Sequence, residues 1–308
     1  MRFSTLDDLA VAVAAAGTKP RVVAAPCAEP KVLNALLDAA ERGLATPVLV
    51  GDMDATADIV AREGRTLDGV MTEHVTDPAK AVQRAVELIR IGEADVLMKG
   101  LVNTDVLLRV VLKRDTGLPT RGILSHVAAF ALPGQHRLTL LTDAGVNVRP
   151  NFQRKLEIVR NGVDVARGLG IATPRVAMLA ATEKVMLPAM PATLDAAMVS
   201  RMAEQGEFGD DVTVAGPMAL DVAISPEAAT SKGCADHPVA GRADILCAPD
   251  IEAGNVLYKA ITTLAKVDMA GIVAGTSVPL VVPSRGDTAR SKYLSIAMAC
   301  YLALGRRA

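Results

Sequence analysis

Aromatic residues are scarce in this chain of 308 residues: they make up 2% of the sequence, and tryptophan is absent. A surface that binds single-stranded nucleic acid by base stacking needs aromatic side chains. The formal net charge is −1 and there is no basic block, although binding to a phosphate backbone depends on clustered lysine and arginine. The sequence therefore predicts no nucleic acid as partner.

Long apolar runs are also missing. No stretch reaches the roughly 20 residues that a membrane-spanning helix requires. The N-terminal segment MRFSTLDDLAVAVAAAG carries two acidic residues beside its apolar part, unlike a secretory signal peptide, which has a basic start. We therefore expect no membrane partner, no signal peptide and a cytoplasmic location.

Cysteines and histidines are few and scattered. The four cysteines form no C-x-x-C pair and the four histidines no H-E-x-x-H pair, which are spacings typical of redox and metal sites. We expect no metal and reduced cysteines. Cys27, Cys247 and Cys300 lie in apolar runs and are predicted to be part of the core.

Apolar residues, in contrast, make up 51% of the chain, and strand-like runs alternate with helix-like segments. This alternation is typical of parallel βα units, so the predicted fold class is α/β. The core must consist mainly of aliphatic side chains. The expected strands are 21–26, 47–51, 94–98, 122–125, 138–142, 175–181, 212–215, 243–248, 271–275 and 279–282.

Capping residues and prolines predict where helices begin. Asp77 followed by Pro78 predicts a helix over 78–90, with apolar residues on one face. A last, long and apolar helix is expected to lie between layers or in an interface. The other expected helix starts are the caps Thr104 and Thr193, then Pro150, and the region of Asp287.

The chain is long enough for two α/β domains. A polar break with proline and glycine at 128–135 predicts the hinge between them. We expect residues 1–128 plus 272–308 to form the first domain and 129–271 the second. The returning chain would then place 284–287 in the cleft between the domains, where ligand sites tend to lie.

The segment PLVVPSRGDTARSKY, residues 279–293, predicts an anion site. An apolar strand, a polar turn and a helix start follow one another, so free N–H groups and the positive end of the helix dipole face a ligand. Arg285 adds a planar fork suited to phosphate, Ser284 adds a hydroxyl, and Gly286 allows close approach of the backbone. The alternative is that Ser284 or Asp287 only caps the helix while Arg285 is solvated.

Four other expected strand ends are followed by polar residues. Because ligands bind at the carboxyl ends of strands in open α/β sheets, these residues predict a polar cleft for an anionic ligand. Lys99 can hold phosphate or lie on the surface, and His126 can be a general base or a core hydrogen-bond donor. The residues are Lys99 and Thr104; Ser125 and His126; Thr142, Asp143 and Asn147; and Asp250, Asn255 and Lys259.

Three common motifs are absent: G-x-G-x-x-G, G-x-x-x-x-G-K-[ST] and G-x-S-x-G. Their absence argues against a standard dinucleotide fold, a P-loop and an α/β-hydrolase. A different α/β scaffold is therefore expected to carry the site.

Longer segments point to one family. They are MKGLVNTDVLLRVVL (98–112), LSHVAAF (124–130), TDAGVN (142–147), MPATLDAA (190–197), GPMALDVAIS (216–225), ADILCAPDIEAGNVLYK (243–259) and PSRGDTARSKYLSIA (283–297). In this order, and over nearly the whole chain, they resemble the phosphate acetyltransferase/phosphate butyryltransferase family. The segments MPATLDAA and DIEAGNVLYK are most similar to the butyryl branch.

The resemblance implies reversible transfer of a short acyl group, butyryl or acetyl, between CoA and inorganic phosphate, which gives an acyl phosphate. It also implies two α/β domains like those of isocitrate/isopropylmalate dehydrogenases, with the active site in the cleft. A homodimer or larger assembly is expected, with its interface in the second domain. CoA is then a substrate, and no cofactor is expected.

The catalytic residues follow from the same resemblance. The family's serine–arginine pair falls on Ser284 and Arg285, and its D-x-x-x-G-N-x-x-Y-K motif on residues 250–259. The aspartate of acetyltransferases, six residues beyond the arginine, is Ser291 here, whereas Asp287 matches the butyryl branch. The CoA thiol needs a base or an electropositive site, and Asp287 is the candidate base. Arg285, Ser284 and helix N–H groups are the candidate donors to the oxyanion.

Two other functions remain open. A NAD(P)- and metal-dependent dehydrogenase of the same fold would need a cluster of aspartates, for which Asp250 and Glu252 are the candidates. A non-catalytic regulatory module would bind acyl-CoA without turning it over. The presence of Ser284 and Arg285 favours an acyltransferase over both.

Overall fold

The computed structural model describes residues 3–284 and 286–307. The chain forms two units, each with strands of its own. Unit 1 consists of Met1–Thr5 and Gly122–Asp268, and unit 2 of Leu6–Arg121 and Met269–Ala308.

These boundaries differ from the expected ones at 128 and 272. The polar break 128–135 is no hinge, because it forms the end of one strand and the turn to the next strand inside unit 1. Proline and glycine are as typical of a hairpin turn as of a link between domains. The pattern alone did not distinguish the two.

Unit 2 is built on a mostly parallel arrangement of strands, and only its last pair is antiparallel. Val22, Val23, Ala24 and Ala25 of its central strand are fully buried, as expected for a parallel strand covered on both faces. In spatial order the strands are β3 (Met71–His74), β2 (Thr46–Gly51), β1 (Arg21–Ala25), β4 (Val96–Lys99), β11 (Leu280–Val281) and β10 (Ala270–Thr276).

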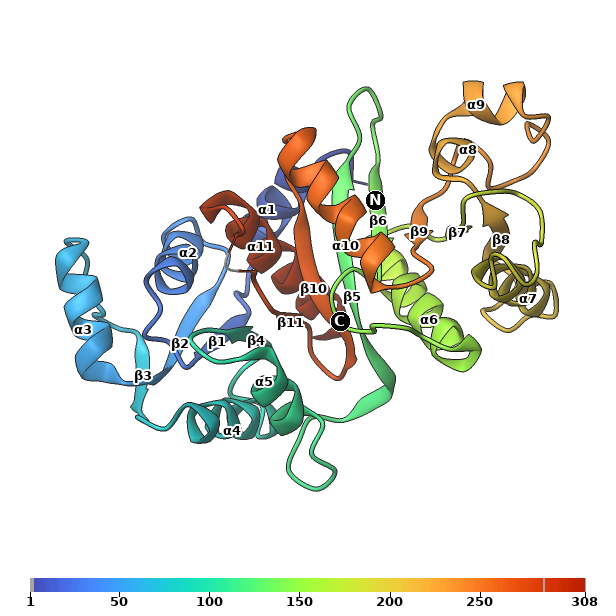
Figure 1. Ribbon diagram of the computed structural model, residues 1–308. Helices are drawn as coiled ribbons and strands as arrows, with labels where there is room; N and C mark the ends of the chain where they lie inside the picture. Colours follow the sequence, from blue (N-terminus) through green and yellow to red (C-terminus); the bar gives the residue numbers. More distant parts are fainter. Residues whose placement is uncertain (1–2, 285, 308) are drawn as a thin grey trace. The chain divides into compact units, whose positions relative to one another are not determined.

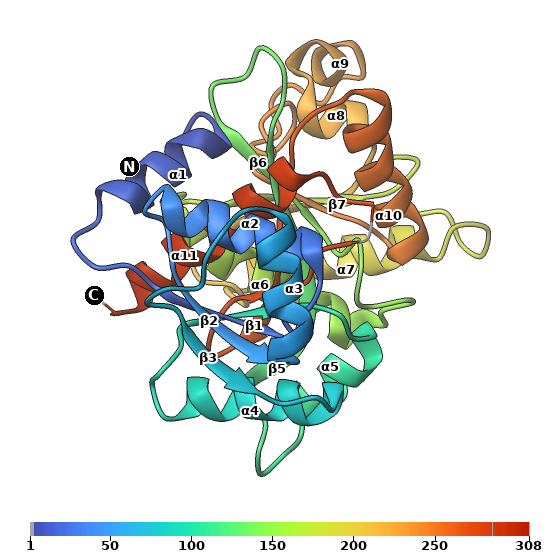
Figure 2. The same cartoon turned by 90° about the vertical axis from the view of Figure 1, so that its left-hand side faces the viewer.

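Helices cover both faces of these strands. One face carries α1 (Leu6–Ala15), α2 (Pro30–Glu41) and α11 (Ala289–Arg307), and the other carries α4 (Pro78–Arg90) and α5 (Thr104–Val111), while α3 (Met53–Arg62) lies beside β3 (Figures 1 and 2). Residues 296–300 of α11 are completely buried. Because α11 packs against α1 and α2 as well as β10, the predicted position between layers is confirmed.

Unit 1 has one antiparallel pair followed by parallel strands. The spatial order is β5 (Thr120–Ala131), β6 (Leu138–Thr142), β9 (Ile245–Cys247), β7 (Arg175–Leu179) and β8 (Thr213–Met218). Helix α6 (Phe152–Gly168) packs on β6 and β9, and α7 (Ala192–Glu204) packs on β7 and β8. The other helices of this unit are α8 (Leu220–Ile224), α9 (Pro226–Ser231) and α10 (Ile251–Lys259). Helix α10 continues as a π-helical turn over Ala260–Leu264. The predicted α/β class is thus confirmed for both units.

The start of α4 agrees with its sequence signal. The carboxylate of Asp77 accepts a hydrogen bond from Lys80 N at 2.8 Å, and Pro78 is the first helical residue. Val82, Val86 and Ile89 are buried, one turn apart on one face. Capping and periodicity are local properties, so both could be recognised without the rest of the fold.

Two threonines do not act as the predicted caps. The N-cap of α5 is Asn103, and Thr104 is the first helical residue. In α7, Thr193 is the second helical residue and its hydroxyl donates to Met190 O at 2.6 Å. A threonine hydroxyl can bond to several nearby backbone groups, so its presence near a helix start does not identify the cap.

Two other helices also begin later than expected. Helix α6 starts two residues after Pro150, with Asn151 as the cap that accepts from Arg154 N. Before α11, the hydroxyl of Thr288 accepts from Ser291 N at 3.0 Å, which is the bond of an N-cap. Thr288, rather than Asp287 or Ser284, therefore caps the last helix.

Strand predictions were wrong where a strand was polar or long. The sequence of β3, MTEH, has little apolar content and is mostly exposed, as befits an edge strand. Strand β5 extends well beyond the expected 122–125. The antiparallel pairs β5–β6 and β10–β11 also interrupt the predicted parallel order.

The expected core cysteines are confirmed. Cys27, Cys247 and Cys300 are at most 1% exposed, and burial raises the pKa of the Cys247 thiol to about 12. Within the described part of the chain, no helix is both long and apolar enough to cross a bilayer.

Candidate functional site

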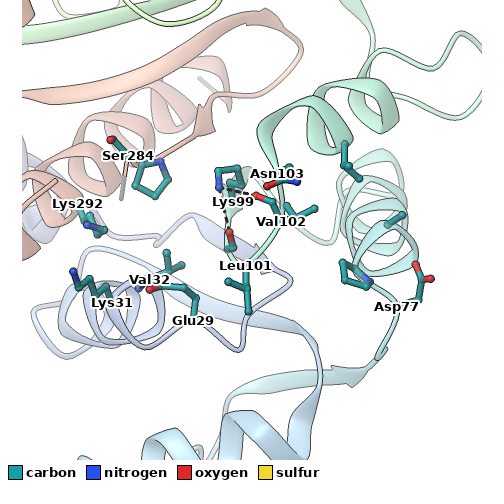
Figure 3. Close-up of a pocket in the computed structure, with 15 residues that line it drawn as sticks. Glu29, Lys31, Val32, Asp77, Lys99, Leu101, Val102, Asn103, Ser284 and Lys292 are labelled. Carbon is teal, nitrogen blue, oxygen red and sulfur yellow. Dashed lines mark hydrogen bonds between the residues drawn. The ribbon is translucent and has the colours of Figure 1, made fainter. Parts of the chain in front are cut away.

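A pocket of about 740 Å³ opens in unit 2 at the carboxyl ends of β1, β4 and β11. Its volume lies in the range of small-molecule sites. The first turns of α2, α4, α5 and α11 also contribute to its wall, so several helix N-termini lie at one pocket (Figure 3). The polar side chains that line it are Glu29, Lys31, Asp77, Lys99, Asn103, Ser284 and Lys292.

Gly100 brings two walls of this pocket together. A Cβ atom at Gly100 would lie 1.8 Å from Pro26 O, a distance that no side chain can occupy. Gly100 N donates to Ala25 O at 3.1 Å, and Leu101 N donates to Pro26 O at 3.0 Å. The loop after β4 is therefore hydrogen-bonded directly to the loop after β1.

Two carboxylates of the pocket are used as helix caps. Glu29 accepts from Val32 N at 2.6 Å at the start of α2, and Asp77 caps α4 as described above. Asn103, at the start of α5, makes no side-chain capping bond. The pocket wall thus contains helix starts with and without a side-chain cap, each with the positive end of its dipole at the pocket.

Three lysines line the same pocket. Lys99, at the end of β4, donates to Val102 O at 2.9 Å and to Gly100 O at 3.3 Å (Figure 3). Lys31 is exposed at the start of α2, whereas Lys292 is only 3% exposed. Ammonium groups and helix N-termini together favour an anionic ligand.

Lys292 is the most unusual of the three lysines. Its Nζ donates to the backbone oxygen of Asp287 at 2.5 Å. Burial lowers the pKa of Lys292, and the neighbouring Lys31 lowers it further, while Asp287 and Glu29 oppose the shift. An ammonium group is thus kept away from water although this is unfavourable, which is common at functional sites.

The predicted turn after β11 adjoins this pocket through Ser284. Asp287 Oδ2 accepts from Ser284 N at 2.8 Å, and Asp287 N donates to Ser284 O at 3.1 Å. Gly286 N approaches Ser284 Oγ at 3.4 Å, and no atom lies within 4 Å of a Cβ placed on Gly286. Arg285 lies outside the described residues, and its role stays a prediction.

In unit 1, the loop after β6 is held by Asp143. This carboxylate, 2% exposed, accepts from Gly145 N, Val146 N and Asn147 N at 2.8–3.0 Å, and from Asn147 Nδ2 at 2.7 Å. Four donors satisfy most of the acceptor sites of a carboxylate. Asp143 therefore positions the loop, and Asn147 also donates to Leu124 O at 2.8 Å.

Two other predicted residues are completely buried in unit 1. Ser125 Oγ accepts from Asn161 Nδ2 at 2.9 Å, and the hydroxyl of Thr142 donates to His126 O at 2.8 Å. Both hydroxyls are engaged inside the unit and have no contact with solvent. The contacts account for these residues as supports of neighbouring backbone, and direct ligand contact stays a prediction.

Helix α10 packs closely on the loop after β6. A Cβ at Gly254 would lie 2.3 Å from Asp143 O. Asn255 Nδ2 donates to Ala144 O at 3.1 Å, while Asp250 caps α10 by accepting from Ala253 N. The D-x-x-x-G-N part of the motif therefore joins this helix to this loop.

The end of α10 places aromatic and basic groups together. The ring of Tyr258 meets that of His126 edge to face, with 5.8 Å between centroids, and Lys259 Nζ lies 5.0 Å from the Tyr258 ring centroid. These contacts bring the predicted residues His126 and Lys259 to one part of unit 1.

Among the described residues, one group has ligand atoms close enough to share a metal ion: Asp52, Asp54 and His74. Asp52 caps α3 by accepting from Asp54 N, and His74 Nδ1 accepts from Met53 N. Asp52 and His74 thus each accept a backbone hydrogen bond at the start of α3. Asp250 and Glu252, the predicted metal pair, belong to no such group among the residues that the structure describes.

Comparison with known proteins identifies the family. The model of the phosphate acetyl/butaryl transferase family matches residues 54–300. This chain belongs to that family. The resemblance inferred from the motifs is thereby confirmed.

Individual relatives cover almost the whole chain. A phosphate butyryltransferase of Clostridium acetobutylicum is 44% identical over 283 residues, covering 92% of this chain and 93% of that protein. A phosphate acetyltransferase of Rhizobium meliloti is 40% identical over 305 residues, 99% of this chain and 95% of that protein. A branched-chain phosphotransacylase of Enterococcus faecalis V583 has a TM-score of 0.82 and 34% identity, covering 92% of this chain and 99% of that one.

Sequence reasoning missed Lys31 and Lys292 as members of the site. Each lies in the first turns of a helix, Lys31 as the second residue of α2 and Lys292 as the fourth of α11. A lysine there opposes the helix dipole. This local conflict was the available signal that both side chains belong to the pocket.

Replacing Lys292 by methionine should stabilise the folded protein near pH 7 by about 1 kcal/mol, because it removes a buried charge. Burial lowers the pKa of Lys292 in the folded state below the ordinary value of 10.5. Between the two pKa values the unfolded chain binds more protons, so the stability of the native protein rises with pH. The advantage of Lys292→Met should therefore shrink towards about pH 10, as measured by urea unfolding.

The matched control is Lys113→Met, at an exposed lysine outside the pocket. It should change stability little at either pH. A Lys292→Met protein that is less stable than the native one near pH 7, or whose advantage persists at high pH, would contradict the assigned cost of the buried charge.

Proposed function

We propose that the protein is a phosphate acyltransferase, which transfers a short acyl group reversibly between CoA and inorganic phosphate. The observation that carries the proposal is the cationic pocket of unit 2, where Ser284 meets three lysines at the carboxyl ends of strands. Such a pocket suits phosphate, which is a substrate whether the acyl group is acetyl or butyryl. Membership of the family supports the same reaction.

In the proposed reaction, an oxygen of phosphate attacks the thioester carbonyl carbon. The C–O bond forms, the carbonyl oxygen becomes an oxyanion, and the C–S bond then breaks to release CoA as a thiolate, which takes up a proton. Ser284, Arg285 and N–H groups of the following helix would stabilise the oxyanion. In the reverse direction Asp287 would accept the thiol proton, since its carboxylate already lies in hydrogen-bond contact with this turn.

No redox step occurs in this scheme, and phosphate is itself an adequate nucleophile and leaving group. We therefore propose that the reaction needs no cofactor or metal, with CoA and phosphate as the partners. The residues of unit 1 named above, from Ser125 to Lys259, would contribute to substrate binding through the loops and helix that they position.

The deciding experiment measures CoA release from acyl-CoA and phosphate, and from acyl phosphate and CoA in reverse. Turnover should continue after exhaustive EDTA treatment. Reduction of NAD(P) dependent on added Mg²⁺ would favour the dehydrogenase alternative, and acyl-CoA binding without turnover would favour the regulatory module.

The same assay tests the acyl group. We expect kcat/KM for butyryl-CoA to exceed that for acetyl-CoA, because the segments MPATLDAA and DIEAGNVLYK and the residue Asp287 match the butyryl branch. One methylene in an apolar pocket gives only about 1–3 kcal/mol of discrimination. A kcat/KM for acetyl-CoA roughly tenfold higher than that for butyryl-CoA would contradict the expected preference for butyryl.

Arg285→Ala should lower kcat/KM by roughly 10²-fold or more, the scale of losing an electrostatic stabiliser of the transition state. The control is Arg290→Ala on the same segment, because Arg290 pairs with Asp7 at 2.6 Å on the surface and such pairs contribute little. Near-normal turnover by a folded Arg285→Ala protein would refute the role of this arginine.

We further propose a homodimer with its interface in unit 1. Three apolar residues before α7 and two on it are 36–55% exposed: Val185, Met186, Leu187, Leu194 and Met198. Met186 N donates to Thr193 Oγ1 at 2.9 Å, so the segment before α7 lies against that helix. An apolar patch of this kind is typical of an interaction surface.

Met198→Glu should therefore shift the mass measured by light scattering from dimer to monomer. Val11→Glu, at an exposed valine of unit 2, should leave the mass unchanged. The reverse result would place the interface elsewhere. A cytoplasmic location is also proposed, since the described cysteines are all free thiols; fractionation of the source cells tests it.

A further inference from the structure

Lys31 and Lys292 come from distant parts of the chain and meet at one end of the unit 2 pocket (Figure 3). Burial lowers the pKa of Lys292 most, Asp287 and Glu29 raise it, and the positive charge of Lys31 adds a smaller lowering. Two ammonium groups so placed repel each other. The helix N-termini on which they lie add positive potential of their own.

Asp287 and Glu29 favour the charged form of Lys292, but Lys292 has few direct partners among the described residues. It forms no ion pair within that part of the chain, and the one hydrogen bond of its ammonium group goes to the backbone oxygen of Asp287. The carboxylate of Glu29 caps α2, and that of Asp287 accepts the Ser284 N–H. An ammonium group has three donors, so two directions remain for a ligand.

We propose that Lys31 and Lys292 bind a phosphoryl group in this pocket, a role that sequence reasoning gave only to Lys99 and the turn at Ser284. The inference rests on the proposed function, whose substrates both carry phosphate. A dianion between the two ammonium groups relieves their repulsion and satisfies their free donors. Ammonium groups suit this task as point charges.

Two sources supply such a group: the reacting phosphate, or a phosphate of CoA. Ser284 adjoins the same pocket, so the reacting phosphate would be held next to the predicted oxyanion donors. A phosphate of CoA would instead anchor the substrate away from the acyl carbon. Both sources present the same phosphoryl group to the lysines, and the ligands named in the experiment below distinguish the reacting phosphate from a phosphate of CoA.

The experiment measures binding by calorimetry to the full-length protein near neutral pH, with inorganic phosphate, CoA, dephospho-CoA and pantetheine as separate ligands. Lys292→Met should weaken binding of the phosphoryl ligand by at least roughly tenfold. The exposed Lys31→Met should weaken it less, by roughly two- to fivefold. Lys292→Arg, which keeps the charge, should recover part of the loss, and the control Lys113→Met should bind as the native protein does.

Weaker binding of inorganic phosphate by Lys292→Met assigns the site to the reactant. Weaker binding of CoA alone assigns it to the 3′-phosphate, and weaker binding of both CoA and dephospho-CoA to the pyrophosphate; pantetheine should be unaffected throughout. Equal binding of every phosphoryl ligand by native protein and folded Lys292→Met overturns the inference while leaving the proposed function intact. If the native protein binds neither phosphate nor CoA, the proposed function fails and the inference fails with it.

Discussion

The close approach of Gly100 to Pro26 O is the contact on which the pocket of unit 2 depends. Strands β1 and β4 are parallel neighbours with Ala25 opposite Lys99, so their carboxyl ends reach the same edge of the sheet. Without a side chain at Gly100, the loop after β4 can donate backbone hydrogen bonds to Ala25 O and Pro26 O, at the end of β1 and in the loop that follows it. Lys99 and the starts of helices α2 and α5, which flank these loops, therefore line one cavity.

The electrostatics of this cavity are unfavourable for stability and favourable for an anion. Buried Lys292, its neighbour Lys31 and several helix N-termini bring positive potential to one place, and the carboxylates of Glu29 and Asp77 are occupied as caps. Buried charge of one sign costs free energy in the absence of a partner. A protein retains such an arrangement where binding requires it, in line with the trade-off between stability and activity.

Unit 1 shows a different use of the polar residues in the family motifs. Asp143 holds the loop after β6 through four hydrogen bonds within that loop, and Gly254 lets helix α10 approach the backbone of the loop closely. Ser125 and Thr142 bond to groups inside the unit. Polar residues after a strand can thus hold the loop that carries a site as readily as they contact a ligand, and the two roles have the same sequence pattern.

The sequence by itself determined the α/β class, the family, most strands and the start of α4 at Asp77, because alternation of apolar runs, long motifs and capping depend on residues close together in the chain. Only the tertiary structure decided that the expected hinge is the end of β5 and the turn to β6, that Thr288 caps α11, and that Lys292 joins Lys31 at the pocket. These features depend on strand pairing and on contacts between segments far apart in sequence. Local patterns do not encode such contacts, so the buried charge of Lys292 could be recognised only in the folded chain.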